Sequence, residues 1–234
     1  MRTLVVIPTY NERANIEKMA RAVLGLGVPD LGILFVDDNS PDGTGTIADE
    51  LSREDARVRV LHRERKEGLG RAYLDGFSHA LALGAERVVQ MDCDFSHNPA
   101  AIEKLLASDG DLVIGSRYVP GGATPGWPFK RRLISRLGGL FIRVVTHLPV
   151  RDPTGGFKCW KAALLRDIDF NKVSSKGYSF QLEMNVIAWR KGAAIREVPI
   201  VFTDRVAGSS KITPGIALES IRVAWALRPR RHAG

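Results

Sequence analysis

The chain of 234 residues is long enough for one large globular domain, and its 44% hydrophobic and 26% charged residues can form a sizeable core. Its two cysteines, Cys93 and Cys159, lie far apart and outside any C-x-x-C pair, which excludes a disulfide framework and a zinc ribbon. No uncharged apolar run approaches the ~18 residues of a membrane span. We therefore expect a cytoplasmic protein with neither a signal peptide nor a membrane-spanning helix.

The net charge of +8 is concentrated in two segments. The segment 112–151 contains no acidic residue, although it holds Arg117, Lys130, Arg131, Arg132, Arg136, Arg143 and Arg151. Further arginines follow Glu219, the last acidic residue of the chain. Basic faces of this kind bind anions, so we expect nucleic acid, phosphorylated lipid or nucleotide as a partner.

Apolar, β-branched runs alternate with helical patterns in the first half of the chain. We predict strands at 3–8, 32–38, 58–63, 87–92 and 111–117, and helices near 13–25, 44–54, 70–83 and 99–107. The runs are too continuous for strands with one face in water, so they indicate parallel strands covered on both faces. The predicted fold class is α/β, with an open, mainly parallel sheet flanked by helices.

The alternation of apolar strands and helices ends after about residue 120. The sequence then predicts a Gly- and Pro-rich turn at 120–128, an amphipathic basic segment at 129–148, a turn or strand at 155–160, a helix near 178–191, a strand at 197–202 and a final helix from 213. We predict one domain over 1–234, with a nucleotide- and metal-binding half at about 1–120, an acceptor half at about 121–212, and a C-terminal helix with a basic tail at 213–234.

Four of the predicted strands end in polar clusters: PTYNE, DDNSPDG, DCDFSH and GSRY. Ligands of open α/β sheets bind at the carboxyl ends of the strands, so these clusters describe one site. In an extended DCDFSH segment, Asp92 and Asp94 would point to one face and Cys93 to the other. Two carboxylates with room for water and substrate suit Mg²⁺ or Mn²⁺ bridged to a diphosphate.

Simpler roles stay open for this segment. A lone D-x-D pair is common in solvated turns and helix caps, and Asn98-Pro99 is typical of a helix start. We interpret His97 as a neighbour of that cap rather than as a ligand, and Cys93 as a small core residue.

Two other motifs also have simpler interpretations. Asp37 and Asp38 are consistent with turn formation before SPDG. Gly68 and Gly70 in KEGLGRAY fit the start of a helix. A helix that opens with glycine also offers backbone N–H groups to an anion, so a binding role stays open there.

Together these motifs resemble a known family. VVIPTYNE, FVDDNSPDGT, GLGRAYLDGF, VQMDCDFSH, GSRYVPGG and DPTGGFKCW, in this order and spacing, are similar to the dolichol-phosphate (polyprenol-phosphate) mannose synthases, which are inverting family 2 glycosyltransferases with the GT-A fold. The resemblance runs from residue 3 to residue 212. It implies transfer of mannose from GDP-mannose to the phosphate of a polyprenyl or dolichyl lipid, with Mg²⁺ or Mn²⁺ as cofactor.

The resemblance also implies roles for individual residues. The base and ribose of the nucleotide would be held by Pro8, Tyr10, Glu12, Val36 and Asp38. Asp92 and Asp94 would ligate the metal, and the backbone of Cys93 would line the nucleotide. Ser96 departs from the pattern, because some relatives carry a longer amide there, but its hydroxyl can reach the metal through water.

The phosphates of donor and acceptor would be met by Arg117, Arg205 and Lys211. Arg205 and Lys211 flank the Gly- and Ser-rich stretch VAGSS, which we expect to close over the bound donor. Asp152 would orient a sugar hydroxyl, and an Asp-Pro turn is an equally good interpretation of it. Because a phosphate acceptor is already anionic, the reaction needs no carboxylate base, and one displacement would give a β-mannosyl phosphate.

Other functions stay open at this level. Within the same class, the main alternative is a polyprenyl-phosphate glucosyltransferase that uses UDP-glucose. A nucleic-acid-binding protein would interleave aromatic with basic residues, and the tail RPRRHAG has no aromatic residue. A non-catalytic nucleotide-binding protein would have a broken metal site. The sugar, the lipid, the oligomeric state and the need for a membrane-anchoring subunit stay undecided.

The segment 129–148 predicts contact with the cytoplasmic face of a membrane. On a helical wheel, its basic side carries Arg132, Arg136 and Arg143, and its apolar side carries Leu133, Leu137, Leu140, Phe141, Val144 and Leu148. The alternative is a helix packed on the sheet with a solvated basic face. The final helix offers a second candidate, with Ile216, Val223 and Leu227 on one side and Leu218, Ile221 and Trp225 almost opposite.

Overall fold

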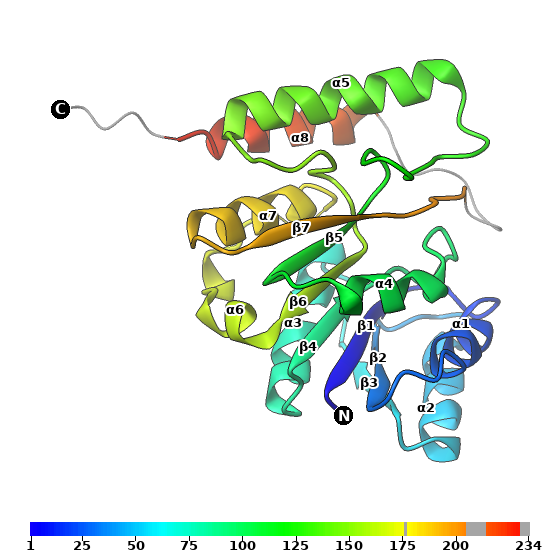
Figure 1. The fold of residues 1–234 in the computed structure, drawn as a ribbon. Helices are drawn as coiled ribbons and strands as arrows, with labels where there is room; N and C mark the ends of the chain where they lie inside the picture. Colours follow the sequence, from blue (N-terminus) through cyan, green and yellow to red (C-terminus); the bar gives the residue numbers. More distant parts are fainter. Residues whose placement is uncertain (176, 205–213, 230–234) are drawn as a thin grey trace.

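The computed structural model describes residues 1–175, 177–204 and 214–229. Within these residues a seven-stranded sheet, in the order β3-β2-β1-β4-β6-β5-β7, forms the centre of the molecule (Figure 1). Its strands are β1 (Thr3–Thr9), β2 (Leu31–Asp37), β3 (Val58–His62), β4 (Arg87–Gln90), β5 (Leu112–Ser116), β6 (Lys158–Lys161) and β7 (Ile195–Pro199). All neighbours pair in parallel except β6, which is antiparallel to both β4 and β5. The prediction of an open, mainly parallel sheet is confirmed.

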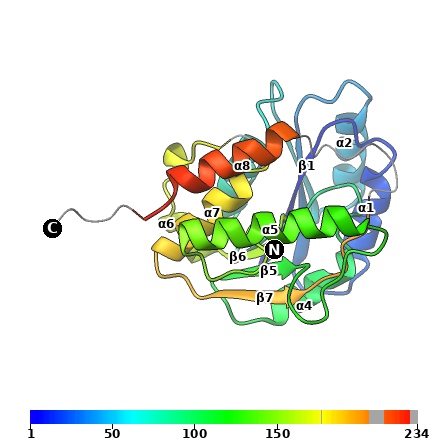
Figure 2. The same cartoon turned by 90° about the horizontal axis from the view of Figure 1, so that it is seen from above.

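Helices cover both faces of the sheet. On one face lie α1 (Ile16–Leu24), α2 (Thr44–Glu54), the 3₁₀ turn η1 (Pro99–Ala101) and α4 (Ile102–Ala107). The other face is covered by α3 (Leu69–Ala82), α6 (Ala162–Asp167), the 3₁₀ turn η2 (Phe170–Lys172) and α7 (Phe180–Arg190). Above this second layer, α5 (Phe129–Thr146) and α8 (Pro214–Ala226) lie side by side (Figures 1 and 2).

The continuous apolar runs are explained by burial on both faces. In β1, Leu4 and Val6 pack in the core below α3, whereas Val5 and Ile7 pack in the core below α1 and α2. Successive side chains of a strand point to opposite faces, so each face needs its own apolar set. Every residue of β2 is buried for the same reason.

Two strands end at least two residues earlier than predicted, and one helix was not predicted. β4 ends at Gln90, and Phe95 adopts a positive φ of 58°, so Asp92 and Asp94 lie in an irregular loop instead of alternating along a strand. The last strand ends at Pro199, because Val201 forms only an isolated bridge. The prediction missed α6, a short helix directly after β6.

The segment 129–148 also differs from its predicted form. Helix α5 ends at Thr146, and Leu148 lies beyond it with 1% of its surface exposed. The face of α5 that packs on the molecule carries Gly139, Ile142 and Thr146. The predicted apolar side of the helix, which carries Leu133, Leu137, Leu140, Phe141 and Val144, is exposed. This contradicts the alternative of an apolar face packed on the sheet.

We predict that Gly76→Ala in α3 destabilises the protein by about 1–3 kcal/mol, because the added methyl group overpacks the core. A Cβ at Gly76 would lie 2.5 Å from Val6 Cγ1 and 2.9 Å from Val36 Cγ2. Equilibrium unfolding in urea measures the change.

The matched control is Gly138→Ala in α5, where a Cβ would meet no atom within 4 Å. Alanine favours helix more than glycine, so this variant should gain up to about 1 kcal/mol. Equal stabilities of the two variants would contradict the packing argument.

Candidate active site

The predicted polar clusters lie at one edge of the sheet. β1, β2, β4 and β5 run in the same direction, so their carboxyl ends meet there. Tyr10, Asp38, Asp92 and Arg117 each follow one of these strands by one or two residues. The edge therefore gathers side chains from distant parts of the sequence, as ligand sites of open α/β sheets require.

The residues expected at the nucleotide lie at the ends of β1 and β2. Pro8 and Val36 are partners across the two strands. Val36 is fully buried against α3, so its contact with the nucleotide stays a prediction. Glu12 is half-buried, and its Oε2 accepts a 2.8 Å hydrogen bond from Asn15 Nδ2. The Nζ of Lys66 lies 3.6 Å from the centre of the Tyr10 ring.

The adjacent acids after β2 have different environments. Asp37 accepts hydrogen bonds from Thr9 Oγ1 at 3.0 Å and from the backbone N–H and hydroxyl of Ser40 at 3.0 and 2.6 Å. These hydrogen bonds to Ser40 give Asp37 the turn-forming role that was open for Asp37 and Asp38. Asp38 forms a buried ion pair with Arg63 instead. Burial raises the pKa of Asp38, and the hydrogen bond and charge of Arg63 oppose that shift.

The loop after β4 holds the proposed metal ligands. Asp92 Oδ1 accepts a 2.7 Å hydrogen bond from the Tyr73 hydroxyl, and Asp94 Oδ1 accepts a 3.0 Å hydrogen bond from the Ser96 N–H. Cys93 lies in the core, as predicted. Burial is the main cause that raises the pKa of its thiol, and the negative charges of Glu12, Asp94 and Asp92 raise it further. The ends of β1 and β4 lie close together, because the two strands pair in parallel.

Tyr73 connects this loop to two helices. It is a fully buried residue of α3, and its ring stacks on Phe180 of α7 at 5.9 Å between centroids. Burial raises the pKa of Tyr73 well above its ordinary value, so the hydroxyl stays a hydrogen-bond donor. The sequence analysis missed this residue, because a helical tyrosine has no local signal for contact with a loop 19 positions away.

His97 and Asn98 confirm the simpler interpretations. Asn98 Oδ1 accepts a 3.0 Å hydrogen bond from the Ala100 N–H and caps η1, which begins at Pro99. His97 precedes that cap and stacks on Phe157 with ring centroids 5.1 Å apart. Burial lowers the pKa of His97 and keeps the ring neutral.

Arg117 and Asp152 form a bidentate pair. Arg117 Nε donates to Asp152 Oδ2 at 2.7 Å, and Nη2 donates to Oδ1 at 2.6 Å. The Arg117 N–H also donates to Oδ2, at 3.0 Å. Asp152 is fully buried; burial raises its pKa, but the charge and hydrogen bonds of Arg117 outweigh burial and lower it overall. The hydrogen bonds described for the Asp152 carboxylate come from Arg117, so its contact with a sugar stays a prediction.

A pocket of about 430 Å³ opens beside this pair. Arg117, Arg132 and Arg136 line it together with Tyr118 and the backbone turn at 122–125, and no carboxylate is among its lining residues. Tyr118 and Ser135 share a 2.5 Å hydrogen bond between the turn and α5. The arrangement suits an anion. The sequence predicted a membrane surface for Arg132 and Arg136, whereas the structure places them at the lining of this pocket.

Arg205 and Lys211 lie outside the described residues. The last described residue before them, Asp204, accepts hydrogen bonds from Trp127 Nε1 at 3.0 Å and from Arg131 Nη1 at 2.9 Å. This contact joins the start of α5 to the strand end that leads toward Arg205.

The donor set at this edge is small. In the described part of the chain, no group of three or more His, Cys, Asp or Glu side chains could hold a metal ion. Asp92 and Asp94 offer two carboxylates, and Ser96 adds a hydroxyl in the same loop. Oxygen ligands completed by water and phosphate are the set that Mg²⁺ and Mn²⁺ prefer.

We predict that Asp152→Asn destabilises the protein by about 3–5 kcal/mol, because it leaves Arg117 as an uncompensated buried charge. The pKa of Asp152 is lowered in the folded state, so the pair stabilises the protein above pH ~4 and this stability is lost as the pH falls through the folded pKa. Urea unfolding at several pH values measures both effects.

The control is Asp109→Asn, since Asp109 is exposed and meets Lys161 at 3.3 Å. Its replacement should change stability by no more than about 0.5 kcal/mol. A similar small loss for Asp152→Asn would show that the Arg117 pair contributes little.

Known proteins match both the sequence and the fold. The family model of glycosyl transferase family 2 matches residues 4–170. An undecaprenyl-phosphate mannosyltransferase of Micrococcus luteus is 44% identical and covers 98% of this chain and 96% of its own. A polyprenol monophosphomannose synthase of Mycolicibacterium smegmatis is 43% identical, covering 98% of this chain and 88% of its own.

Solved structures share the architecture at low identity. Glucosyl-3-phosphoglycerate synthase from Mycobacterium tuberculosis, in complex with Mn²⁺, UDP-glucose and phosphoglyceric acid, superposes with a TM-score of 0.70 at 20% identity and covers 99% of this chain and 82% of its own. S. aureus TarS in complex with UDP-GlcNAc gives 0.64 at 21% identity, covering 96% and 65%. The chain therefore belongs to glycosyl transferase family 2, as an enzyme with the GT-A fold.

Proposed function

We propose that the protein transfers mannose from GDP-mannose to the phosphate of a polyprenyl or dolichyl lipid and releases GDP. The observation that carries the proposal is the basic pocket at Arg117, Arg132 and Arg136, next to the outward apolar row of α5. A lipid phosphate is complementary to this arrangement, because its anionic head suits the basic pocket and its tail suits the apolar row. The activities of the relatives from Micrococcus luteus and Mycolicibacterium smegmatis support this substrate class.

Each end of the site has its own task in this proposal. Tyr10, Glu12 and Asp38, with the backbone of Pro8, Val36 and Cys93, bind the base and ribose. Arg117, Arg132 and Arg136 bind the acceptor phosphate and reduce its repulsion from the donor diphosphate. Arg205 and Lys211 are proposed as further phosphate contacts, and Asp152 holds Arg117 in place and stays a proposed contact of the sugar.

Asp92 and Asp94 are proposed to hold Mg²⁺ or Mn²⁺, with Ser96 as a contact through water. The bound ion would neutralise charge on the departing diphosphate. Tyr73 and the Ser96 N–H orient the two carboxylates through the hydrogen bonds given above.

The acceptor phosphate is itself the nucleophile, so the site needs no general base for it. The chain's contribution is to align two anionic partners and to neutralise their charge. A single displacement at the sugar carbon would invert an α-linked donor to a β-mannosyl phosphate.

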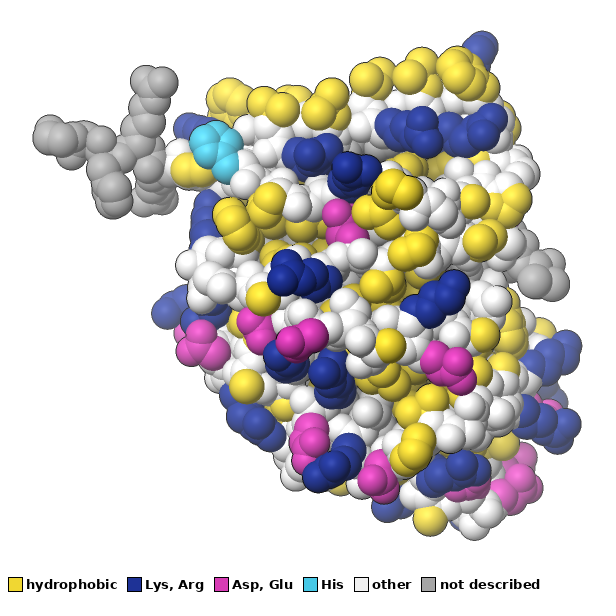
Figure 3. Space-filling view, in the orientation of Figure 1, with side chains coloured by type: hydrophobic (Ala, Val, Ile, Leu, Met, Phe, Trp, Pro, Cys, Tyr) yellow, Lys and Arg dark blue, Asp and Glu magenta, His cyan; other side chains and the backbone are white. Residues whose placement is uncertain are grey.

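The outward face of α5 supports contact with a membrane surface. Its exposed apolar side chains form a row above Lys and Arg side chains (Figure 3), and comprise Phe129, Leu133, Ile134, Leu137, Leu140, Phe141 and Val144. Ile134 is 69% exposed and Val144 is 66% exposed. No helix in the described parts of the chain is long and apolar enough to cross a bilayer.

Helix α8 extends this surface. Ile221 and Trp225 are exposed, whereas Val223 and Leu227 pack against the core. The two-sided character predicted for this helix is confirmed at these positions, and the side chains of Ile216 and Leu218 lie outside the described set. We propose that both helices rest on the cytoplasmic face of a membrane.

We predict that the purified protein, with polyprenyl phosphate and Mg²⁺ or Mn²⁺, converts GDP-mannose into a lipid-soluble mannosyl phosphate. Thin-layer chromatography of radiolabelled product measures it, with UDP-glucose and UDP-GlcNAc as parallel donors. Transfer only from UDP-glucose would replace mannose by glucose in the proposal, and transfer from no donor would reject it.

The matched variants for this assay are Asp94→Asn and Cys93→Ala. Loss of one carboxylate should abolish nearly all turnover, while the asparagine Oδ1 still accepts the Ser96 N–H and preserves the fold. Cys93→Ala should lower stability through lost core packing and leave turnover largely intact.

We predict that the protein binds anionic vesicles peripherally, and that Ile134→Ser with Val144→Ser weakens this binding by removing apolar contact. Salt should also weaken binding, because basic residues near an anionic leaflet contribute about 1 kcal/mol each. Co-sedimentation at increasing salt measures both effects.

Two further variants sharpen the vesicle experiment. Charge reversal of Arg132, Arg136 and Arg143 to Glu should remove most of the salt-dependent part. Leu83→Ser is the control, because Leu83 is exposed at the end of α3, away from α5 (Figure 1). Equal vesicle binding by wild type and by the α5 variants would exclude this face.

A further inference from the structure

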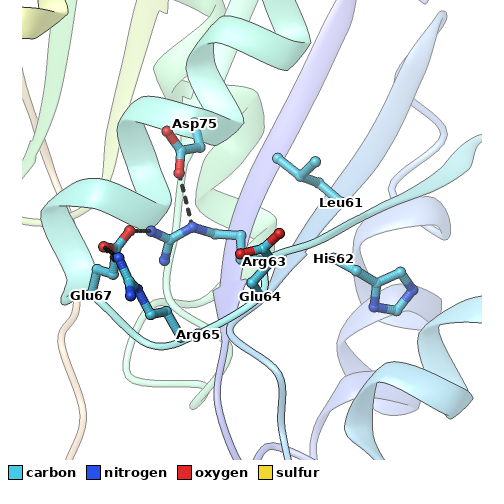
Figure 4. A pocket seen from close by; sticks show the side chains of 7 residues that line it. All are labelled: Leu61, His62, Arg63, Glu64, Arg65, Glu67 and Asp75. Atoms are coloured by element: carbon cyan, nitrogen blue, oxygen red, sulfur yellow. Dashed lines mark hydrogen bonds and ion pairs between the residues drawn. The ribbon is translucent and has the colours of Figure 1, made fainter.

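A buried arginine organises the end of β3. Arg63 follows this strand directly, and 6% of its side chain is exposed. Its guanidinium meets three carboxylates: Nη1 binds Asp38, Nε donates to Asp75 at 2.8 Å, and Nη2 donates to Glu67 at 3.2 Å. Figure 4 shows Arg63 with Asp75 and Glu67 in a pocket of about 290 Å³. We call Arg63 and its three partners, Asp38, Glu67 and Asp75, the Arg63 cluster.

The three carboxylates differ in exposure. The side chain of Asp38 is 7% exposed, whereas those of Glu67 and Asp75 are each 39% exposed. Water can solvate the two outer carboxylates, but Asp38 depends on Arg63 for its charge partner. Glu67 and Asp75 therefore fix the position of the Arg63 guanidinium, and the guanidinium fixes the position of the Asp38 carboxylate.

The backbone around Asp38 is equally constrained. The Asp38 N–H donates to Thr9 O at 3.0 Å, and the Arg63 N–H donates to Asp37 O at 2.8 Å. These bonds join the ends of β1, β2 and β3. With the backbone fixed, the direction of the Asp38 carboxylate is set by its ion pair with Arg63.

The same loop reaches the proposed nucleotide site. Lys66 lies over the ring of Tyr10, and its charge also acts on Asp38. Tyr10 offers a flat surface for a planar base, and Asp38 offers an acceptor for N–H groups along the edge of that base. Such recognition requires a carboxylate that is ionised and correctly oriented.

We propose that Arg63 is a positioning residue for nucleotide binding, which acts by orienting Asp38 and keeping it ionised rather than by touching the nucleotide. This inference rests on the proposed function, in which Asp38 contacts the base. Glu67 and Asp75 belong to the same device because they hold Arg63.

The charges around Asp38 support this role. Burial raises the pKa of Asp38 overall, Arg63 and Lys66 lower it, and the charge of Asp37 also raises it. Glu67 and Asp75 face Asp38 across the guanidinium. Without Arg63, the Asp38 carboxyl would take up a proton at a higher pH, so GDP binding by Arg63→Gln should improve as the pH is raised.

A double-mutant cycle tests the proposal. Calorimetric titration with GDP and Mg²⁺ compares wild type, Arg63→Gln, Asp38→Asn and the double variant. Each single change should weaken GDP binding by about tenfold or more, as expected for a hydrogen bond to a charged group. The double variant should bind no more weakly than Asp38→Asn alone, because Arg63 acts through Asp38.

The outcomes separate the two levels of inference. Unchanged GDP binding by Asp38→Asn would reject the nucleotide role of Asp38 in the proposed function. Weakened binding by Asp38→Asn with additive loss in the double variant would leave that role intact and overturn the positioning role of Arg63.

Two variants control for folding and charge. Arg65→Gln removes a positive charge from the same pocket, but the Arg65 side chain is 79% exposed and pairs with Glu67. It should bind GDP like wild type. Arg63→Lys keeps the charge without the fork of donors, so it should bind GDP between wild type and Arg63→Gln while melting close to wild type. Equal GDP affinities of Arg63→Gln and Arg65→Gln would overturn the proposal.

Discussion

Burial of the central strands on both faces is the constraint on which the rest of the molecule depends. Because every residue of β2 is buried, a polar side chain within the strand would need its own buried hydrogen-bond partner, and β2 carries one only at its last residue, Asp37. Polar side chains gather mainly where the strands end and the chain meets water. The carboxyl edge therefore contains the charged side chains, turns and hydrogen-bond donors of the candidate site.

Buried charge at this edge is arranged in pairs. Arg63 meets Asp38 at the end proposed for the nucleotide, and Arg117 meets Asp152 at the end proposed for the acceptor. Asp92 lies between them and accepts a hydrogen bond from a buried tyrosine hydroxyl. Paired charges offset the cost of burial at both ends of the site, and Asp94 in the central loop accepts a hydrogen bond from the Ser96 N–H.

Helix α5 relates the site to the surface of the molecule. Gly139 and Ile142 pack inward, whereas the predicted apolar side of α5 is exposed. Arg132 and Arg136 of the same helix line the pocket beside Arg117. One helix thus presents an apolar surface and a basic pocket side by side. A phosphate attached to a lipid could occupy the pocket without its chain leaving the apolar surface.

Local pattern was sufficient for the α/β class, the strand order along the chain, the polar strand ends, the core role of Cys93 and the helix start at Asn98-Pro99. Each of these depends on the spacing of apolar residues or on turn chemistry within a few positions. The tertiary structure alone decided that β6 enters antiparallel between β4 and β5, that α5 turns its apolar side outward, and that Arg63 meets Asp38 and Tyr73 meets Asp92. These features depend on which faces meet after the chain has folded, and contacts between residues 19 and 25 positions apart leave no periodic trace in the sequence.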